Sequence, residues 1–137
     1  MQKYYYLIWA IGAILLIFGG GVIFQILNAP AAPNEEGEGT YAVSYTDSTG
    51  YIPNTLTIKK GGRVVFKNES SKEMWVASQP HPTHTLYPKS GGCIGSIFDS
   101  CRGIPTGNFW SFTFDVSGTW QYHNHLHPRY TGIIIVQ

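Results

Sequence analysis

From Thr40 to the C-terminus, the sequence is a series of short β-favouring runs separated by turn residues. Apolar and polar residues alternate from Leu56 to Lys59 and again from Phe109 to Phe114. Successive side chains of a strand point to opposite faces, so this alternation predicts strands with one buried face. Because several such runs are closely spaced and punctuated by Gly, Pro, Asn and Asp, the pattern predicts an all-β fold, an antiparallel β-sandwich. The predicted strands are residues 41–45, 56–59, 64–67, 74–77, 109–114, 119–124 and 132–136, with a hairpin turn at residues 60–63.

The composition limits both the number of domains and the kinds of partner. Setting aside the apolar N-terminal run leaves roughly 100 residues, which is enough for one small domain with a single core. Aromatic residues make up 15% of the chain and charged residues 12%, as is typical of a compact β-rich domain. Nine Lys and Arg residues nearly balance eight Asp and Glu residues, and no basic stripe stands out. The sequence therefore gives no support to a nucleic-acid partner.

The N-terminal segment, residues 1–27, is predicted to be a transmembrane anchor. No charged residue lies between Tyr4 and Leu27, and a helix of this length, at about 1.5 Å per residue, crosses a hydrocarbon core of roughly 30 Å. Lys3 precedes the run and several glutamates follow it. The positive-inside rule then predicts a single-pass membrane protein with a cytoplasmic N-terminus and a periplasmic or extracellular domain. A cleaved signal peptide is the alternative, because small residues follow the apolar run.

Residues 28–39 are predicted to form a linker between the anchor and the folded domain. This stretch consists of Pro, Ala, Asn, Glu and Gly, so almost nothing in it can join a core. The predicted domain therefore comprises residues 40–137.

Histidines occupy two short segments of the sequence. The five are His81, His84, His123, His125 and His127. Imidazole is the commonest protein metal ligand near neutral pH, so histidines clustered in this way predict a metal site. On a strand that Pro128 is expected to end, His123 and His125 would share one face. The alternative is a run of half-exposed histidines in a turn, which would bind nothing.

Cys93 and Cys101 form an even pair on the predicted outer side of the membrane, where cysteines most often form a disulfide. Closing so short a loop stabilises a fold by roughly 2–3 kcal/mol on the chain-entropy model. Metal binding by the two thiolates is the alternative, although their separation is wider than in a Cys-x-x-Cys site.

Two stretches of the sequence resemble cupredoxins, the small blue-copper β-sandwiches that include plastocyanin. Residues 52–68 look like the opening strands of that family. Residues 118–132 resemble its ligand loop, Tyr-His-Cys-x-x-His-Pro-x-Met-x-Gly, with the same spacing throughout. The resemblance covers residues 40–137. It implies a Greek-key sandwich with a metal site at one end, formed by an upstream histidine and this last loop.

The resemblance implies a ligand set dominated by imidazole. By the family pattern His127 is a ligand, and the upstream ligand falls on His84, with His81 as the second choice. Asn124 stands where the family has its copper-binding Cys, and Tyr130 stands where it has the axial Met. Loss of the thiolate leaves nitrogen and oxygen donors that suit copper, with zinc as the other metal considered. It also removes the ligand that gives blue copper its colour.

A second, shorter likeness points to a different face of the sheet. Residues 120–125 are similar to the Tyr-His-x-His stretches of multicopper oxidases, in which the two histidines bind copper on the face opposite the blue site. This likeness implies His123 and His125 as ligands. They would need further histidines, and a symmetric homo-oligomer would supply them at a subunit interface.

These patterns lead to three hypotheses about function. The first is a membrane-anchored copper-binding protein on the outer face, acting in electron transfer or copper handling with a redox or copper-delivery partner that the sequence does not identify. The second is a copper-dependent oxidoreductase with a mononuclear or subunit-interface site, which would need an open coordination position. The third is a metal-free interaction module. Hydrolysis is not predicted, because the sequence shows no nucleophile paired with a base.

Overall fold

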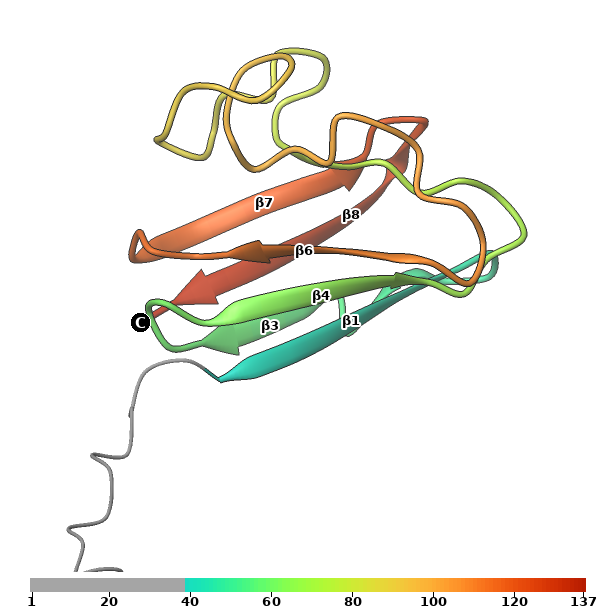
Figure 1. Ribbon diagram of the computed structural model, residues 1–137, viewed down its shortest axis with the longest axis horizontal. Coiled ribbons are helices and arrows are strands. Elements are labelled where there is room, and N and C mark those ends of the chain that lie inside the picture. Colours follow the sequence, from blue (N-terminus) through green and yellow to red (C-terminus); the bar gives the residue numbers. More distant parts are fainter. Residues whose placement is uncertain (1–38) are drawn as a thin grey trace, which may run out of the picture. The chain divides into compact units, whose positions relative to one another are not determined.

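The structure, a computed structural model, describes residues 39–137. These residues form a sandwich of two four-stranded β-sheets (Figure 1). The all-β sandwich predicted from the alternation of apolar residues is therefore confirmed. The strands are β1 (Thr40–Thr46), β2 (Gly50–Ile52), β3 (Thr55–Ile58), β4 (Arg63–Asn68), β5 (Val76–Ser78), β6 (Phe109–Thr113), β7 (Gly118–Asn124) and β8 (His127–Val136).

The two sheets are mixed rather than purely antiparallel. One sheet has the strand order β2-β1-β4-β6 and the other β3-β8-β7-β5. The expectation of an antiparallel sandwich was wrong for two pairs, since β1 runs parallel to β4 and β3 runs parallel to β8. The chain changes sheet on entering β3 and again on entering β4, so β4 returns to the first sheet in the same direction as β1. Periodicity predicts that a strand exists, but it does not predict the neighbours of that strand.

The turn between β3 and β4 shows the same limit. The predicted hairpin was wrong, because β3 and β4 lie in different sheets. The Gly62 N–H donates to the Lys59 carbonyl at 2.9 Å, and Gly61 has a φ of 85°. Glycine adopts this left-handed conformation without steric penalty, and a corner between sheets needs it as much as a hairpin does. The same turn residues are therefore consistent with both connections.

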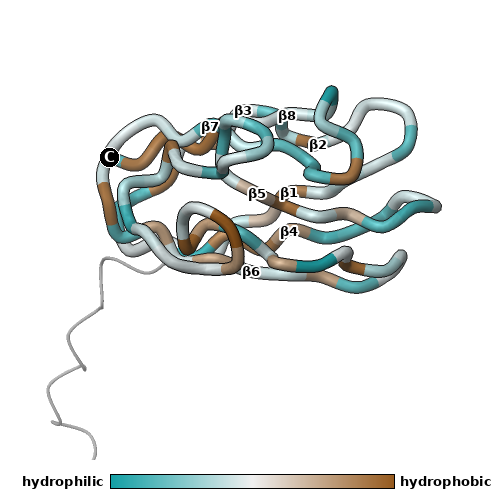
Figure 2. The backbone as a smooth tube through the Cα atoms, turned by 90° about the horizontal axis from the view of Figure 1, so that it is seen from above, coloured by the Kyte–Doolittle hydropathy of each residue, from teal (hydrophilic) through white to brown (hydrophobic). Residues whose placement is uncertain are grey.

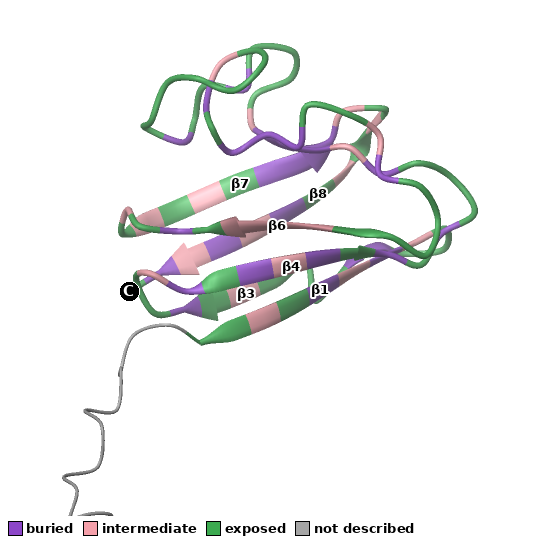
Figure 3. Cartoon of the chain, in the orientation of Figure 1, coloured by how far each residue is buried: buried purple, intermediate pink, exposed green. Residues whose placement is uncertain are grey.

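Aromatic side chains from both sheets fill the core. Phe66 on β4 and Tyr122 on β7 pack edge to face, with ring centroids 5.2 Å apart. Phe98, from the connection between β5 and β6, packs against Phe114 at 4.8 Å and is fully buried. Buried and less buried positions alternate along β4 (Figure 3), and hydrophobic positions are interspersed with hydrophilic ones along the strands (Figure 2). Burying one such side chain contributes roughly 1.5–3 kcal/mol to stability. Through Phe98, the core therefore stabilises the connection between β5 and β6 in addition to the two sheets.

β7 ends at the same residue as the predicted strand 119–124, but the β7–β8 turn comes before Pro128. β7 ends at Asn124 and β8 begins at His127, which leaves His125 and Leu126 as the turn. Pro128 does not end the first strand, as had been expected, but lies near the start of β8. The strand register is interrupted on β8 between His127 and Thr131. A proline, which has no N–H to donate, is tolerated at such an irregularity.

The connection between β5 and β6, residues 79–108, contains the predicted disulfide. Cys93 and Cys101 are bonded, with their Cα atoms 5.5 Å apart, and this prediction is confirmed. The end of the disulfide loop lies alongside β5, where the Ser100 N–H donates to the Val76 carbonyl at 2.8 Å. The connection is therefore held against the sheet that carries β7.

The predicted membrane anchor, residues 1–27, lies outside the described residues, and so does the linker as far as residue 38. Within residues 39–137, no helix is long and apolar enough to cross a membrane. The anchor, the linker and the domain boundary at Thr40 remain predictions.

Candidate metal centre

Four of the five histidines come together at one place in the fold. Two of them belong to the connection that follows β5, one lies near the end of β7, and one lies in the β7–β8 turn: His81, His84, His123 and His125. Each offers a ring nitrogen, and these nitrogens all lie within 4.8 Å of one another. Two segments about forty positions apart in the sequence thus form a single cluster of imidazoles.

The cluster lies on the outer face of its sheet, not between the sheets. Tyr122 is fully buried in the aromatic core, and the next residue of a strand points to the opposite face. His123 therefore points away from the core, yet it is also 0% exposed. The segment carrying His81 and His84 covers it there, with ring centroids 5.3 Å and 5.0 Å from that of His123.

Two pairs of ring nitrogens have the spacing of ligands that share one ion. Nε2 of His84 lies 2.9 Å from Nδ1 of His125, and Nδ1 of His81 lies 3.3 Å from Nε2 of His123. Metal–nitrogen bonds of about 2.0–2.1 Å, at angles of roughly 90–110°, place neighbouring nitrogens about 2.8–3.4 Å apart. These two pairs have that spacing, and all four ring nitrogens lie within 4.8 Å of one another, so the cluster is able to hold a metal ion.

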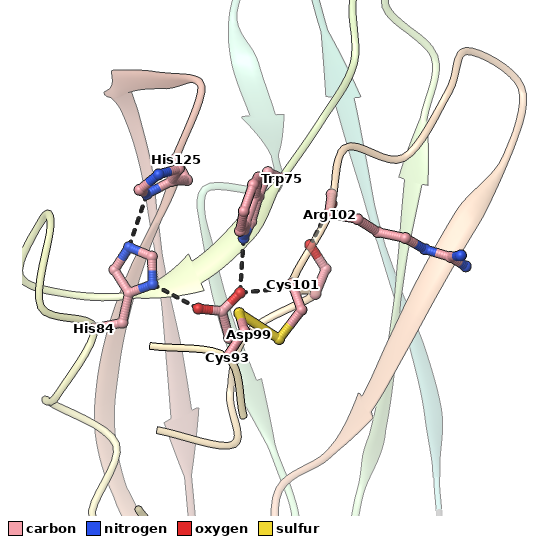
Figure 4. Close-up of a disulfide and its surroundings, with 8 residues drawn as sticks. Trp75, His84, Cys93, Asp99, Cys101, Arg102 and His125 are labelled. Atoms are coloured by element: carbon pink, nitrogen blue, oxygen red, sulfur yellow. Dashed lines mark hydrogen bonds and ion pairs between the residues drawn. A yellow bond between two sulfur atoms is a disulfide. The ribbon is translucent and has the colours of Figure 1, made fainter. Parts of the chain in front are cut away.

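A buried carboxylate orients the site. The Nδ1–H of His84 donates to Oδ2 of Asp99 at 2.5 Å, and Nε2 of that ring faces His125 (Figure 4). Oδ1 of Asp99 accepts hydrogen bonds from Trp75 Nε1–H at 2.7 Å and from the Cys101 N–H at 2.8 Å. The Trp75 ring packs on His125 with centroids 4.6 Å apart. Carboxylates that accept the second ring N–H of a metal-binding histidine fix its tautomer and orientation.

The backbone around this carboxylate is strained. Among the described residues, the non-glycine residues with positive φ are His84, at 53°, and Cys101, at 57°. Such conformations are uncommon and cluster at functional sites, where the surrounding structure enforces them. Both residues are direct hydrogen-bond partners of Asp99.

Two of the histidines are electrically neutral near pH 7. Burial, followed by the neighbouring imidazoles of His84 and His81, lowers the pKa of His123 to about 4. Burial and the same two neighbours also lower the pKa of His125. A neutral imidazole keeps a lone pair for a metal, whereas a protonated one does not. His123 Nδ1 is buried without a hydrogen-bond partner, whereas Nε2 is the ring nitrogen that lies near His81.

The site is closed on one side and open on the other. His84 and His123 are 0% exposed, whereas His81 is exposed and His125 is half-buried. Solvent therefore reaches two of the four imidazoles. This is the side from which an ion would reach the cluster.

The other residues that the resemblance implied lie apart from the cluster. His127 is half-buried at the start of β8 and is not one of the four clustered histidines. Tyr130 donates its hydroxyl to the Asp47 carbonyl at 3.2 Å and packs against Tyr45. Neither residue belongs to the group of ring nitrogens that lie within 4.8 Å of one another, and their role as ligands stays a prediction.

Asn124, at the position of the family Cys, accepts hydrogen bonds from the backbone. It is fully buried, and its Oδ1 accepts hydrogen bonds from the N–H groups of Trp75 and Leu126, each at 3.1 Å. It thereby links Trp75, the residue before β5, to Leu126 in the β7–β8 turn. The sequence reasoning missed this bracing role, and it also missed Asp99 and Trp75. The one available signal was an acidic residue two positions before a cysteine, in a domain with few acidic residues.

No protein-family model matches the chain, and no curated protein sequence does. Solved structures are similar to it. A purple cupredoxin from Nitrosopumilus maritimus has a TM-score of 0.57 at 22% identity, covering 71% of this chain and 99% of that one. A Cu(I) form of an amicyanin variant has a TM-score of 0.57 at 22% identity, covering 79% and 91%. Another reduced amicyanin variant has a TM-score of 0.52 at 21% identity, covering 80% and 92%. The described domain therefore has the cupredoxin fold, with a four-histidine cluster able to hold a metal on the outer face of one sheet.

Proposed function

We propose that this protein binds copper through His81, His84, His123 and His125 and takes part in copper handling on the outer side of a membrane. The observation that carries the proposal is the convergence of four imidazoles from two distant segments, with their donor atoms within 4.8 Å. A chance surface grouping would not need two fully buried imidazoles and a buried carboxylate to orient one of them.

Copper is the metal that the donor set favours most. Imidazole suits copper, zinc, iron and nickel, and the divalent stability order places Cu(II) above the others. The structurally similar amicyanins are described in Cu(I) forms, so the fold accommodates copper elsewhere. Zinc is the competitor, because four imidazoles also satisfy its tetrahedral preference.

Copper handling fits the site better than blue-copper electron transfer does. Both cysteines are joined in a disulfide, and the structure leaves no free cysteine among residues 39–137. The thiolate responsible for the blue-copper spectrum is therefore not available there. Two solvent-accessible imidazoles instead suit an ion that is taken up and passed on.

The placement outside a membrane rests on two features of the sequence. The uncharged run from Tyr4 to Leu27 is long enough to span a bilayer. A disulfide forms and persists in an oxidising compartment such as the periplasm or the cell exterior. The domain would then meet copper before it enters the cytoplasm or after it leaves.

An oxidoreductase remains the alternative hypothesis from the sequence, but no observation favours it over copper handling. A cavity of about 340 Å³ lies elsewhere on the domain, lined by Arg102, Gly103, Ile104, Pro105, Asn108 and Phe109. None of the four histidines lines it, so this cavity does not place a substrate beside the proposed ion.

Copper titration of the purified full-length chain in detergent tests the proposal. We expect one equivalent of Cu(II) in competition with a chelator of known affinity. The His123→Ala/His125→Ala double variant should lose at least about a hundredfold in affinity, which is about 2.7 kcal/mol. The loaded protein should be nearly colourless, because a copper–thiolate band requires sulfur.

His127→Ala is the matched control, since this histidine belongs to the same hairpin but not to the cluster. It should stay within about twofold of the unmodified protein. If His127→Ala abolishes copper binding and the double variant does not, the ion lies on the inner side of the hairpin and the four-histidine site is wrong.

A further inference from the structure

A second group of metal-binding atoms lies next to the histidine cluster. Cys93, Cys101 and Asp99 place their sulfur and carboxylate atoms within 4.8 Å of one another. Both cysteines are solvent-exposed, although they are joined as a disulfide. The disulfide therefore lies at the surface of the domain and not in its core.

The disulfide is not the only contact that holds its loop. The Ile97 N–H donates to the Lys89 carbonyl at 3.0 Å, and Ser90 and Ser96 form a β-bridge, so the segment around Cys93 is closed by backbone contacts. These contacts do not involve sulfur. They keep the Cys93 side of the loop folded back on itself when the S–S bond is broken.

The Cys101 side of the loop is held against β5. The Phe98 carbonyl accepts the Ser78 N–H at 2.9 Å, Asp99 forms a β-bridge with Ala77, and the Phe98 ring is fully buried in the core. Both ends of the loop thus keep their neighbours independently of the disulfide. Opening the disulfide should leave two thiols held close together, which reduces the entropy lost when both bind one ion.

We propose that Cys93 and Cys101, when reduced, form a second metal site that takes Cu(I) through their two sulfur atoms, beside the Asp99 carboxylate. Thiolates are soft ligands that select Cu(I), whereas the imidazole cluster lacks sulfur. The step consumes two electrons and two protons, which convert the S–S bond into two thiols. A dithiol reductant supplies them and is itself oxidised to a disulfide. Cu(I) then displaces the thiol protons as it binds.

The two sites adjoin each other. Asp99 lies in the cysteine group and also accepts the Nδ1–H of His84 at 2.5 Å. Gly95, inside the disulfide loop, packs so closely on the other segment that a Cβ there would overlap the Thr83 carbonyl oxygen. The disulfide loop and the histidine segment are therefore in direct backbone contact, and the redox state of the cysteines sets how many ions this end of the domain holds.

The test compares Cu(I) binding by the oxidised and the reduced full-length chain. A phosphine reduces the disulfide, because phosphine, water and S–S give phosphine oxide and two thiols, and it is removed under anaerobic conditions. Cu(I) is then titrated against a colorimetric Cu(I) chelator while the ultraviolet thiolate–Cu(I) absorption is followed. We expect the reduced chain to take one equivalent more than the oxidised chain, together with that absorption.

Two variants separate this site from the histidine cluster. The Cys93→Ser/Cys101→Ser variant should lose the additional equivalent and its absorption while it keeps Cu(II) binding. The His123→Ala/His125→Ala variant should keep the additional equivalent when reduced, so failure of the histidine site leaves this result intact. Equal Cu(I) uptake by the oxidised and reduced chains, or an additional equivalent that survives in the serine variant, would overturn the proposal.

Discussion

Asp99 is the residue whose substitution tests the candidate site most directly. Within residues 39–137 it is the only buried carboxylate, at 6% exposure. It accepts three hydrogen bonds, from His84, Trp75 and the Cys101 backbone. Through His84 it orients one imidazole directly, and through the Trp75 ring it supports His125. A buried carboxylate is stable only with such partners. The three hydrogen bonds therefore fix the position of Asp99, and Asp99 in turn fixes the positions of its donors.

The Asp99→Asn substitution keeps the size of the side chain but removes its negative charge. The asparagine amide no longer offers a carboxylate to His84, so that ring is free to change tautomer. Loss of an outer-shell carboxylate typically lowers metal affinity about 10–100-fold, and we expect a decrease of that size for Cu(II). Competition titration measures it.

Asp115→Asn is the control for this substitution, because Asp115 is exposed and pairs with Lys89 away from the histidines. It should leave Cu(II) affinity unchanged. If Asp99→Asn also binds Cu(II) as the unmodified protein does, the carboxylate supports the loop but does not orient the ligand.

At the scale of elements, the disulfide loop is the segment whose stability is most easily tested. Cys93 and Cys101 close a short loop, with a sequence separation of 8. Their replacement by serine restores loop entropy to the unfolded chain, so we expect the free energy of unfolding to fall by roughly 2–3 kcal/mol. Urea unfolding of the full-length chain measures it. An unchanged unfolding midpoint would show that the backbone contacts of the loop supply all of its stabilisation.

Individual strands could be predicted from the sequence because alternation is a local property. The runs 109–114 and 119–124 correspond closely to β6 and β7. The pairing of strands could not be predicted in this way. β3 and β4 are separated by a turn rich in glycine, and only the distant partners β8 and β1 decide that they enter different sheets.

The candidate site was predicted in part. The two histidine segments and the disulfide were recognised from the types and spacing of their residues. The resemblance pointed to His127, whereas the structure gathers His123 and His125 with His81 and His84. The shorter likeness to multicopper oxidases described this face of the strand better. It assigned the missing partners to another subunit, because sequence cannot show that the connection after β5 folds back over β7 of the same chain.

At the scale of the whole molecule, the candidate site is built on the outside of the sandwich. The aromatic core occupies the inner faces of both sheets, and Asn124 fills the inward position with hydrogen bonds to backbone. His123 instead lies under the connection that carries His81 and His84, and the core anchors this connection through Phe98. Folding of the core and assembly of the metal site are therefore coupled through one segment, residues 79–108.

Because His123 is buried in the folded chain, the stability of the metal-free protein should depend on pH. Burial lowers the pKa of His123 to about 4, from 6.5 in a solvent-exposed imidazole. Between these two values the unfolded chain binds a proton that the folded chain refuses. The contribution of His123 to the free energy of unfolding should therefore be complete above about pH 6.5. It should decrease as the pH falls towards about 4. His125, whose pKa burial also lowers, acts in the same direction.

Urea unfolding at several pH values, with a chelator present to exclude metal, measures this dependence. The matched variant is His123→Gln, which removes the titrating ring and keeps a neutral polar side chain. Carboxylates elsewhere titrate in both proteins, so the difference between the two isolates the imidazole. The unmodified protein should lose more stability than the variant between about pH 6.5 and 4. Parallel pH profiles would mean that His123 becomes protonated without opposing the fold, and that the cover provided by the His81 and His84 segment opens more readily than its packing in the structure indicates.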